Sequence, residues 1–211
     1  DVRWSGGMFY GATTAANLLL ISNGVDSPKK YTSSAGVSAL GGSPPSTGKF
    51  GTSWGGRWWL FSGDTASYSA VNDAETWTGA DAGSIQIDRG SGDVTGVTVF
   101  MGNLFIFKRR KIFRMLPTNN LSETAVREVS HIIGTAGHFT VAEARGGFLM
   151  FESDNGIAGA VATSSTGGFY VDNVSDRVKP LLDRRDKGQQ ATNWATYNED
   201  RDEYWFQYGT T

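Results

Sequence analysis

The sequence contains no cysteine, and only two of its 211 residues, His131 and His138, are histidines. Disulfide frameworks and thiolate metal sites are therefore excluded, and a histidine-rich catalytic zinc site is nearly excluded. No apolar run approaches the roughly 20 residues of a membrane-spanning helix, so we expect no membrane span. An excess of basic charge is also lacking, since 19 Lys and Arg face 21 Asp and Glu, which argues against a general nucleic-acid binder.

Glycine and aromatic residues are abundant instead. Glycine occupies 28 positions, aromatic residues make up 12% of the chain, and charged residues only 19%. This composition is typical of short strands joined by tight turns. The length favours a single domain over residues 1–211, large enough to bury a core.

A short aromatic and aliphatic segment, entered through a Gly, Asn or polar turn, recurs five times. The copies start about 40 to 56 residues apart, which brackets the length of a propeller blade. Such near-continuous apolar segments are typical of strands buried on both faces. The five copies are residues 17–22, 57–62, 103–108, 147–152 and 203–208.

Further strand patterns surround each copy. A strand and a tight turn precede most copies, and two weaker strands follow, which is the four-stranded pattern of a blade. The sequence thus predicts an all-β fold, a β-propeller of about five four-stranded blades, although a β-sandwich or barrel stays open as an alternative. The fifth unit has only two strands, so either residues near Asp1 complete it or the protein continues beyond this chain. The approximate blades are 1–46, 47–91, 92–136, 137–188 and 189–211.

Several segments of the sequence resemble those of a known protein family. They are residues 20–31, 69–77, 94–108, 133–135, 148–156 and 197–205. In this order they resemble the β-propeller structural proteins of tailed bacteriophages, found among tail, tail-tube and nozzle-like components. The resemblance implies a non-enzymatic structural role in the virion tail, assembled in the host cytoplasm, with other virion proteins as partners in a ring homo-oligomer. It carries over no catalytic or cofactor residue.

The only dense basic run is the candidate contact site. Lys108, Arg109, Arg110 and Lys111 follow the third apolar segment. Arginine suits phosphate and carboxylate groups, so the run could contact phage DNA in a channel or an acidic partner. The alternative interpretation is a solvated hairpin tip, or lysines that block strand pairing.

Carboxylates give no catalytic pair. Glycoside hydrolysis needs two carboxylates about 5–10 Å apart, but the available acids fall mostly in turns or at strand ends, where solvated carboxylates are ordinary. We therefore predict no enzyme activity and no catalytic, cofactor or metal site, and keep a glycosidase only as the least favoured function. The acids considered are Glu143, Glu152, Asp154, Glu199 and Asp202.

Other polar motifs have structural interpretations. Residues 72–77 resemble the aspartate-box turn of sialidase-type propellers, with Glu75 in place of its glycine and Trp77 one position early, so we expect Asp73 to cap a turn. Residues 198–203 predict a polar turn, and 183–187 alternate in charge, which predicts mutual neutralisation on a surface turn. The two histidines are expected to be structural, and Asn155-Gly156 to supply the positive φ of a hairpin turn.

Tryptophan supports the second candidate function. Packing between blades accounts for several of these side chains, but any that reach the surface would make sugar-binding platforms or interface anchors. The alternative function is therefore a lectin-like five-bladed module that binds host-surface glycans. The residues concerned are Trp54, Trp58, Trp59, Trp77, Trp194 and Trp205.

Overall fold

The computed structural model describes residues 3–13, 16–116, 121, 125–163 and 168–209. Within these residues no helix is long and apolar enough to cross a membrane. The chain divides into two compact units, residues 1–94 with 117–125 and residues 95–116 with 126–211, and each is described by itself.

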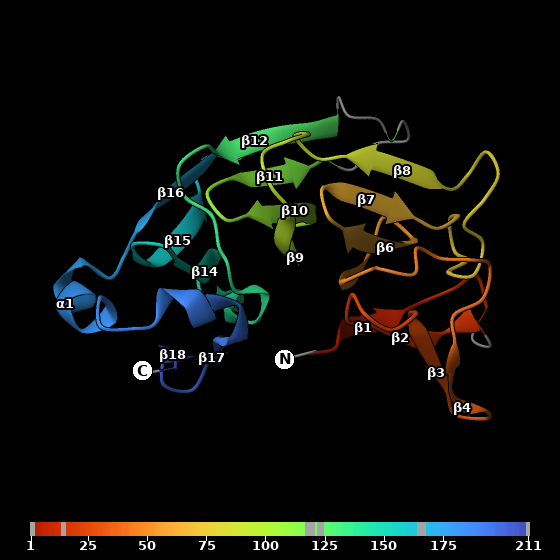
Figure 1. Cartoon of the computed structure of the whole chain (residues 1–211), viewed down its shortest axis with the longest axis horizontal. Helices are drawn as coiled ribbons and strands as arrows, with labels where there is room; N and C mark the ends of the chain where they lie inside the picture. Colours follow the sequence, from red (N-terminus) through yellow and green to blue (C-terminus); the bar gives the residue numbers. More distant parts are fainter. Residues whose placement is uncertain (1–2, 14–15, 117–120, 122–124, 164–167, 210–211) are drawn as a thin grey trace. The chain divides into compact units, whose positions relative to one another are not determined.

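The first unit holds two antiparallel sheets whose strands follow one another in chain order (Figure 1). The first sheet consists of β1 (Ser5–Phe9), β2 (Leu18–Ser22), β3 (Lys29–Thr32) and β4 (Gly36–Ala39). The second consists of β5 (Phe50–Trp54), β6 (Arg57–Ser62), β7 (Thr65–Tyr68) and β8 (Gly83–Gln86).

The second unit repeats this topology in two sheets and ends in a two-stranded ribbon. Its sheets are β9 (Val94–Phe100), β10 (Asn103–Lys108), β11 (Ile112–Met115) and β12 (Val126–Ser130), then β13 (Ala142–Ala144), β14 (Phe148–Ser153), β15 (Gly156–Ala162) and β16 (Phe169–Asn173). The ribbon is β17 (Trp194–Asn198) and β18 (Glu203–Gln207). Its short helices are η3 (His138–Thr140), η4 (Asp176–Val178), α1 (Lys179–Leu182) and η5 (Lys187–Thr192).

The all-β class and the repeated four-stranded units are confirmed. Each predicted hairpin appears as a pair of neighbouring antiparallel strands. The first described strand, β1, pairs with β2 in the first sheet, while β17 and β18 pair with each other. Closure of five blades into one propeller domain stays a prediction.

Burial of the repeated strand differs among the five copies. Four consecutive residues of β6 are buried, Trp58 to Phe61, and so are Leu104 to Phe107 of β10, as expected for strands covered on both faces. The expectation is wrong for β2, where exposed or half-exposed residues interrupt the buried ones, and for β18, where every residue is exposed or half-exposed. In these two strands one face of the sheet meets solvent, so apolar composition alone overstates burial.

The core of the second unit is aromatic. Phe105 is fully buried, with ring centroids 5.6 Å from Phe100 and 4.9 Å from Phe169. Phe107 packs edge-on against Phe151 at 5.1 Å, which joins β10 to β14. These contacts bury large apolar side chains between the two four-stranded sheets of this unit.

Tight turns depend on positive φ at particular positions. The β5–β6 turn places both Gly55 and Gly56 at positive φ, as its sequence predicts. The β14–β15 turn differs, because Asn155 has no positive φ and Gly156, the first residue of β15, takes φ 141°. The predicted role of Asn155 is therefore wrong, and the extended chain after the turn uses the glycine instead.

Truncation of Phe105 tests the aromatic core. We expect Phe105→Ala to lower the free energy of unfolding by about 3–5 kcal/mol, because it removes a fully buried ring. Phe148→Ala is the matched control, since Phe148 lies in the same unit but is 43% exposed, and should cost less than about 1 kcal/mol. Chemical denaturation of both variants measures the difference, and equal losses would contradict this core.

Candidate functional site

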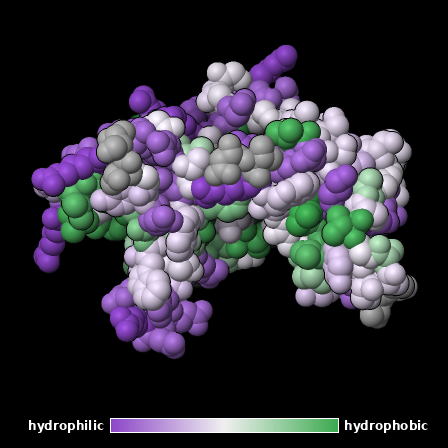
Figure 2. Space-filling view, turned by 60° about the horizontal axis from the view of Figure 1, so that its bottom comes forward, coloured by the Kyte–Doolittle hydropathy of each residue, from purple (hydrophilic) through white to green (hydrophobic). Residues whose placement is uncertain are grey.

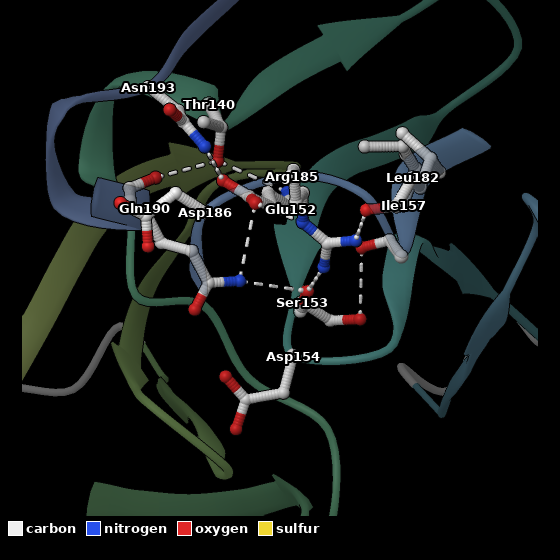
Figure 3. A network of polar contacts seen from close by, with 12 residues as sticks. Thr140, Glu152, Ser153, Asp154, Ile157, Leu182, Arg185, Asp186, Gln190 and Asn193 are labelled. Carbon is white, nitrogen blue, oxygen red and sulfur yellow. Dashed lines mark hydrogen bonds and ion pairs between the residues drawn. The ribbon is translucent and has the colours of Figure 1, made fainter. Parts of the chain in front are cut away.

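A buried carboxylate lies at the end of β14 in the second unit. The Glu152 side chain is fully buried and accepts hydrogen bonds from Arg185 Nε at 2.7 Å, Gln190 Nε2 at 3.2 Å and Asn193 Nδ2 at 2.8 Å (Figure 3). Three donors from one downstream segment thus converge on one side chain. This compensates the cost of burying its charge.

The guanidinium of Arg185 is equally enclosed. It donates from Nη1 to the carbonyl of Leu182 at 2.8 Å and from Nη2 to the carbonyl of Ser153 at 2.6 Å. The prediction that residues 183–187 neutralise one another on a surface turn is therefore wrong for Arg185. Its partner, Glu152, stands 33 positions earlier in the chain, so local alternation of charge could not indicate the pair.

Two hydroxyl groups extend the network to η3 and β18. Thr140 Oγ1 accepts the backbone N–H of Glu152 at 3.1 Å and donates to the carbonyl of Gly137 at 2.7 Å. Tyr204 Oη donates to the carbonyl of Thr140. Burial, with the Glu152 charge second, raises the pKa of Tyr204 far above its ordinary value, so this phenol remains a donor at neutral pH.

Asp154 belongs to the outer side of the same turn and points away from Arg185 (Figure 3). Its Oδ2 accepts from Arg109 Nε at 3.3 Å and from Arg110 Nε at 3.4 Å. Its Oδ1 is covered and lies 3.0 Å from Arg109 Nη2, without the angle of a hydrogen bond, so that contact is an ion pair only. One carboxylate therefore holds two neighbouring guanidiniums.

Gln190 connects the exposed arginine to the buried network. Its Oε1 accepts from Arg109 Nη2 at 3.2 Å, while its Nε2 donates to Glu152 and to the carbonyl of Ser153. The Gln190 side chain is itself buried. Arg109 is thus positioned through a side chain that the Glu152 network fixes.

A pocket of about 460 Å³ opens beside these groups. Gly134 lies in its wall, where an added Cβ would fall 2.0 Å from the carbonyl oxygen of Lys108. The neighbouring Thr135 N–H donates to that carbonyl at 3.1 Å, so only glycine permits this close approach. Other lining residues include Arg109, Arg110, His131, Ile132, Asp154 and Asn155.

The predicted basic run divides into different environments. Lys108 ends β10 and is buried, which corrects the interpretation of the whole run as a solvated hairpin tip. The side chains of Arg109 and Arg110 are 54% and 76% exposed and line the pocket. Lys111 Nζ lies 3.9 Å from Glu128 Oε2. Of the four predicted contact residues, Arg109 and Arg110 are the most exposed, and contact of the run with DNA or an acidic partner stays a prediction.

The other carboxylates have varied surroundings. Glu152, expected to be solvated, is buried, and that expectation is wrong. Glu143 and Glu199 line a second pocket of about 360 Å³ together with Arg145 and Tyr197. Asp202 accepts the hydroxyl of Tyr197. The hydrogen bond that the Tyr197 hydroxyl donates to Asp202 raises the pKa of Tyr197.

Two predicted polar turns and His138 make the structural contacts expected of them. Asp73 accepts the Glu75 N–H at 2.9 Å and the Thr76 hydroxyl at 2.8 Å, which confirms a capped turn. Asn198 likewise accepts backbone N–H groups at the tip of the ribbon. His138 Nδ1 accepts the N–H of Val97 at 3.3 Å, whereas His131 lines the pocket. Within the described residues no group of three potential ligands could hold a metal ion.

Tryptophans differ in burial, and Trp77 is partly buried against the core of the first unit. Trp54, Trp58 and Trp59 lie in the core, whereas Trp194 and Trp205 are 44% and 46% exposed. Thr196 lies opposite Trp205, so both indoles occupy one face of the β17–β18 ribbon. Figure 2 shows hydrophobic residues reaching the surface in separate patches among hydrophilic ones.

Removal of the Glu152 charge tests the buried network. We expect Glu152→Gln to lower the free energy of unfolding by about 3–5 kcal/mol, because Arg185 is left buried without a counter-charge. Glu128→Gln, which alters a partly exposed contact of 3.9 Å, should cost less than about 1 kcal/mol. Chemical denaturation compares the two, and similar small losses would contradict the network.

Comparison with known proteins concerns the fold alone. No protein family and no curated protein matches the chain. Among solved structures the chain is similar to one described as the extracellular domain of a hybrid two-component system from B. thetaiotaomicron, with a TM-score of 0.56 and 12% identity. The match covers 96% of this chain and 25% of that one, so this chain spans about a quarter of its length. The all-β architecture of repeated antiparallel sheets thus has a solved counterpart.

Proposed function

We propose that this chain is a non-enzymatic structural component of a phage virion, a propeller-type part of the tail. In this proposal the five sheets fan out around a common axis as blades, and subunits associate with other virion proteins in a ring. The sequence resemblance to phage β-propeller proteins suggests the setting. The observation that carries the mechanical role is the repetition of four-stranded sheets with buried aromatic strands, which gives a rigid scaffold.

Contacts of the polar residues also favour a structural role. Glu152 is fully buried and has its oxygens engaged by three protein donors, so it holds the fold and is not presented to a substrate. Within the described residues β17 and β18 pair only with each other as named strands. In this proposal the outer edge of β18 accepts a strand from a neighbouring virion subunit, whereas β17 already contacts β13 and η3 of its own unit.

Location in purified particles tests the virion role. In immunogold electron microscopy of the phage that encodes this chain, we expect antibodies against the chain to label the tail of the particles. Glycan-cleaving assays of the purified chain should show no activity. Preimmune serum is the control for the labelling. Detection of the chain only outside particles, or hydrolase activity that Glu143→Gln abolishes, would contradict the proposal.

A glycan-binding module is the second candidate, because two indoles share an exposed face. Trp194 and Trp205 occupy this face of the ribbon, and Trp205 Nε1 donates to Glu203 Oε2 at 2.8 Å, which orients its ring. Exposed aromatic rings stack on the apolar faces of sugars. This arrangement supports binding of host-surface glycans as an alternative to a purely structural role.

Replacement of the exposed indoles tests the second candidate. We expect Trp194→Ala and Trp205→Ala to abolish binding on a glycan array, while thermal stability changes little because neither ring is in the core. Trp4→Ala is the matched control, since Trp4 is 39% exposed and lies in the other unit. Binding that survives both ribbon substitutions, or no binding by the unaltered chain, would contradict this candidate.

A further inference from the structure

The charged side chains that line the pocket beside Asp154 have a net positive charge. Arg109 and Arg110 contribute two guanidiniums and Asp154 one carboxylate, so these three side chains together carry one net positive charge. Within the part of the chain that the structure describes, Arg110 hydrogen-bonds only through Nε, and Arg109 through Nε and Nη2. The remaining N–H groups of both arginines are donors for a bound group.

The arginines are held in place before any ligand arrives. Arg109 is fixed on two sides, by Asp154 and by Gln190, and Gln190 is fixed in turn by buried Glu152. The close approach of Gly134 to the Lys108 carbonyl also holds the backbone of the turn that carries the two arginines. Side chains positioned by a second layer of contacts lose less entropy on binding than free surface arginines.

Charge and donor pattern indicate the class of ligand. A single net positive charge matches a monoanion, and the planar guanidinium suits a carboxylate in a two-point contact. Asp154 Oδ2 receives only long contacts of 3.3 and 3.4 Å and can accept a further hydroxyl donor. A ligand that carries both a carboxylate and adjacent hydroxyl groups satisfies both requirements. The phosphodiesters of DNA do not, because they offer Asp154 no hydrogen-bond donor and their negative charge is repelled by its carboxylate.

The remaining wall suits the same ligand. Ile132 is 68% exposed and supplies an apolar surface, while His131 and Asn155 supply polar groups for hydroxyls. The volume of about 460 Å³ falls in the range of small-molecule sites. We propose that the Arg109–Arg110–Asp154 pocket binds a carboxylate-bearing sugar, such as a terminal uronic acid unit. This site goes beyond a scaffold role and does not depend on the tryptophan face.

Calorimetric titration of the whole chain tests the pocket. The probe is a glucuronate-terminated oligosaccharide, compared with a glucose-terminated oligosaccharide of the same length and with a short DNA duplex. We expect the acidic sugar to bind at least about tenfold more tightly than the neutral one, and Arg110→Gln to weaken that binding about tenfold or more. Arg110 is largely exposed, so its variant should fold normally, which circular dichroism checks.

A matched variant distinguishes binding in the pocket from a general effect of losing one positive charge. Arg127→Gln removes an exposed arginine of β12 outside the pocket and should leave binding unchanged. Equal affinity for the acidic and neutral oligosaccharides, no binding of either, or an equal loss in the Arg127 variant would overturn the proposal. Tighter binding of the DNA duplex with the same dependence on Arg110 would also overturn it, in favour of a phosphodiester site.

Discussion

The ion pair between Glu152 and Arg185 is the contact on which the second unit depends. It joins the end of β14 to the segment after α1, and both side chains are fully enclosed. Such a pair adds little net stability compared with apolar packing, but removal of one member leaves a buried charge without compensation. The pair acts by positioning other side chains, because Gln190, Asn193 and Thr140 all form hydrogen bonds with Glu152. Through Gln190 the same pair orients Arg109 at the surface.

Much of the fold could be predicted from local pattern, because alternation and turn residues act over a few positions. The hairpins around β6, β10 and β14 follow directly from apolar segments entered through glycine turns. Burial of a whole strand depends on what covers it, which no local pattern records, so β18 carries an exposed Trp205 where a buried strand was predicted. The burial of Lys108 could not be predicted for the same reason. Its charge suggested exposure to solvent, but at the end of β10 its side chain is buried.

Of the candidate site, the sequence indicates the two arginines but not their partners. Charge density marks Arg109 and Arg110, whereas Asp154 is 44 or more residues away and was assigned to an ordinary turn. Arg185 lies in the segment 183–187, whose alternating charges suggest a solvated surface, and only tertiary folding brings it and Gln190 to Glu152. A rigid, repeated β scaffold that presents a fixed basic pocket fits both a role in assembly and recognition of an acidic partner, since each needs side chains held in place before contact.

Hydrogen exchange, followed by mass spectrometry, tests most directly whether the buried pair positions the surface site. The comparison is between the unaltered chain and Glu152→Gln at a temperature where both are folded. The account predicts faster amide exchange in η5 and in the turn that carries Arg109 and Arg110, while the amides of β6 in the other unit keep their protection. Unchanged exchange in η5 and in the arginine turn would contradict it.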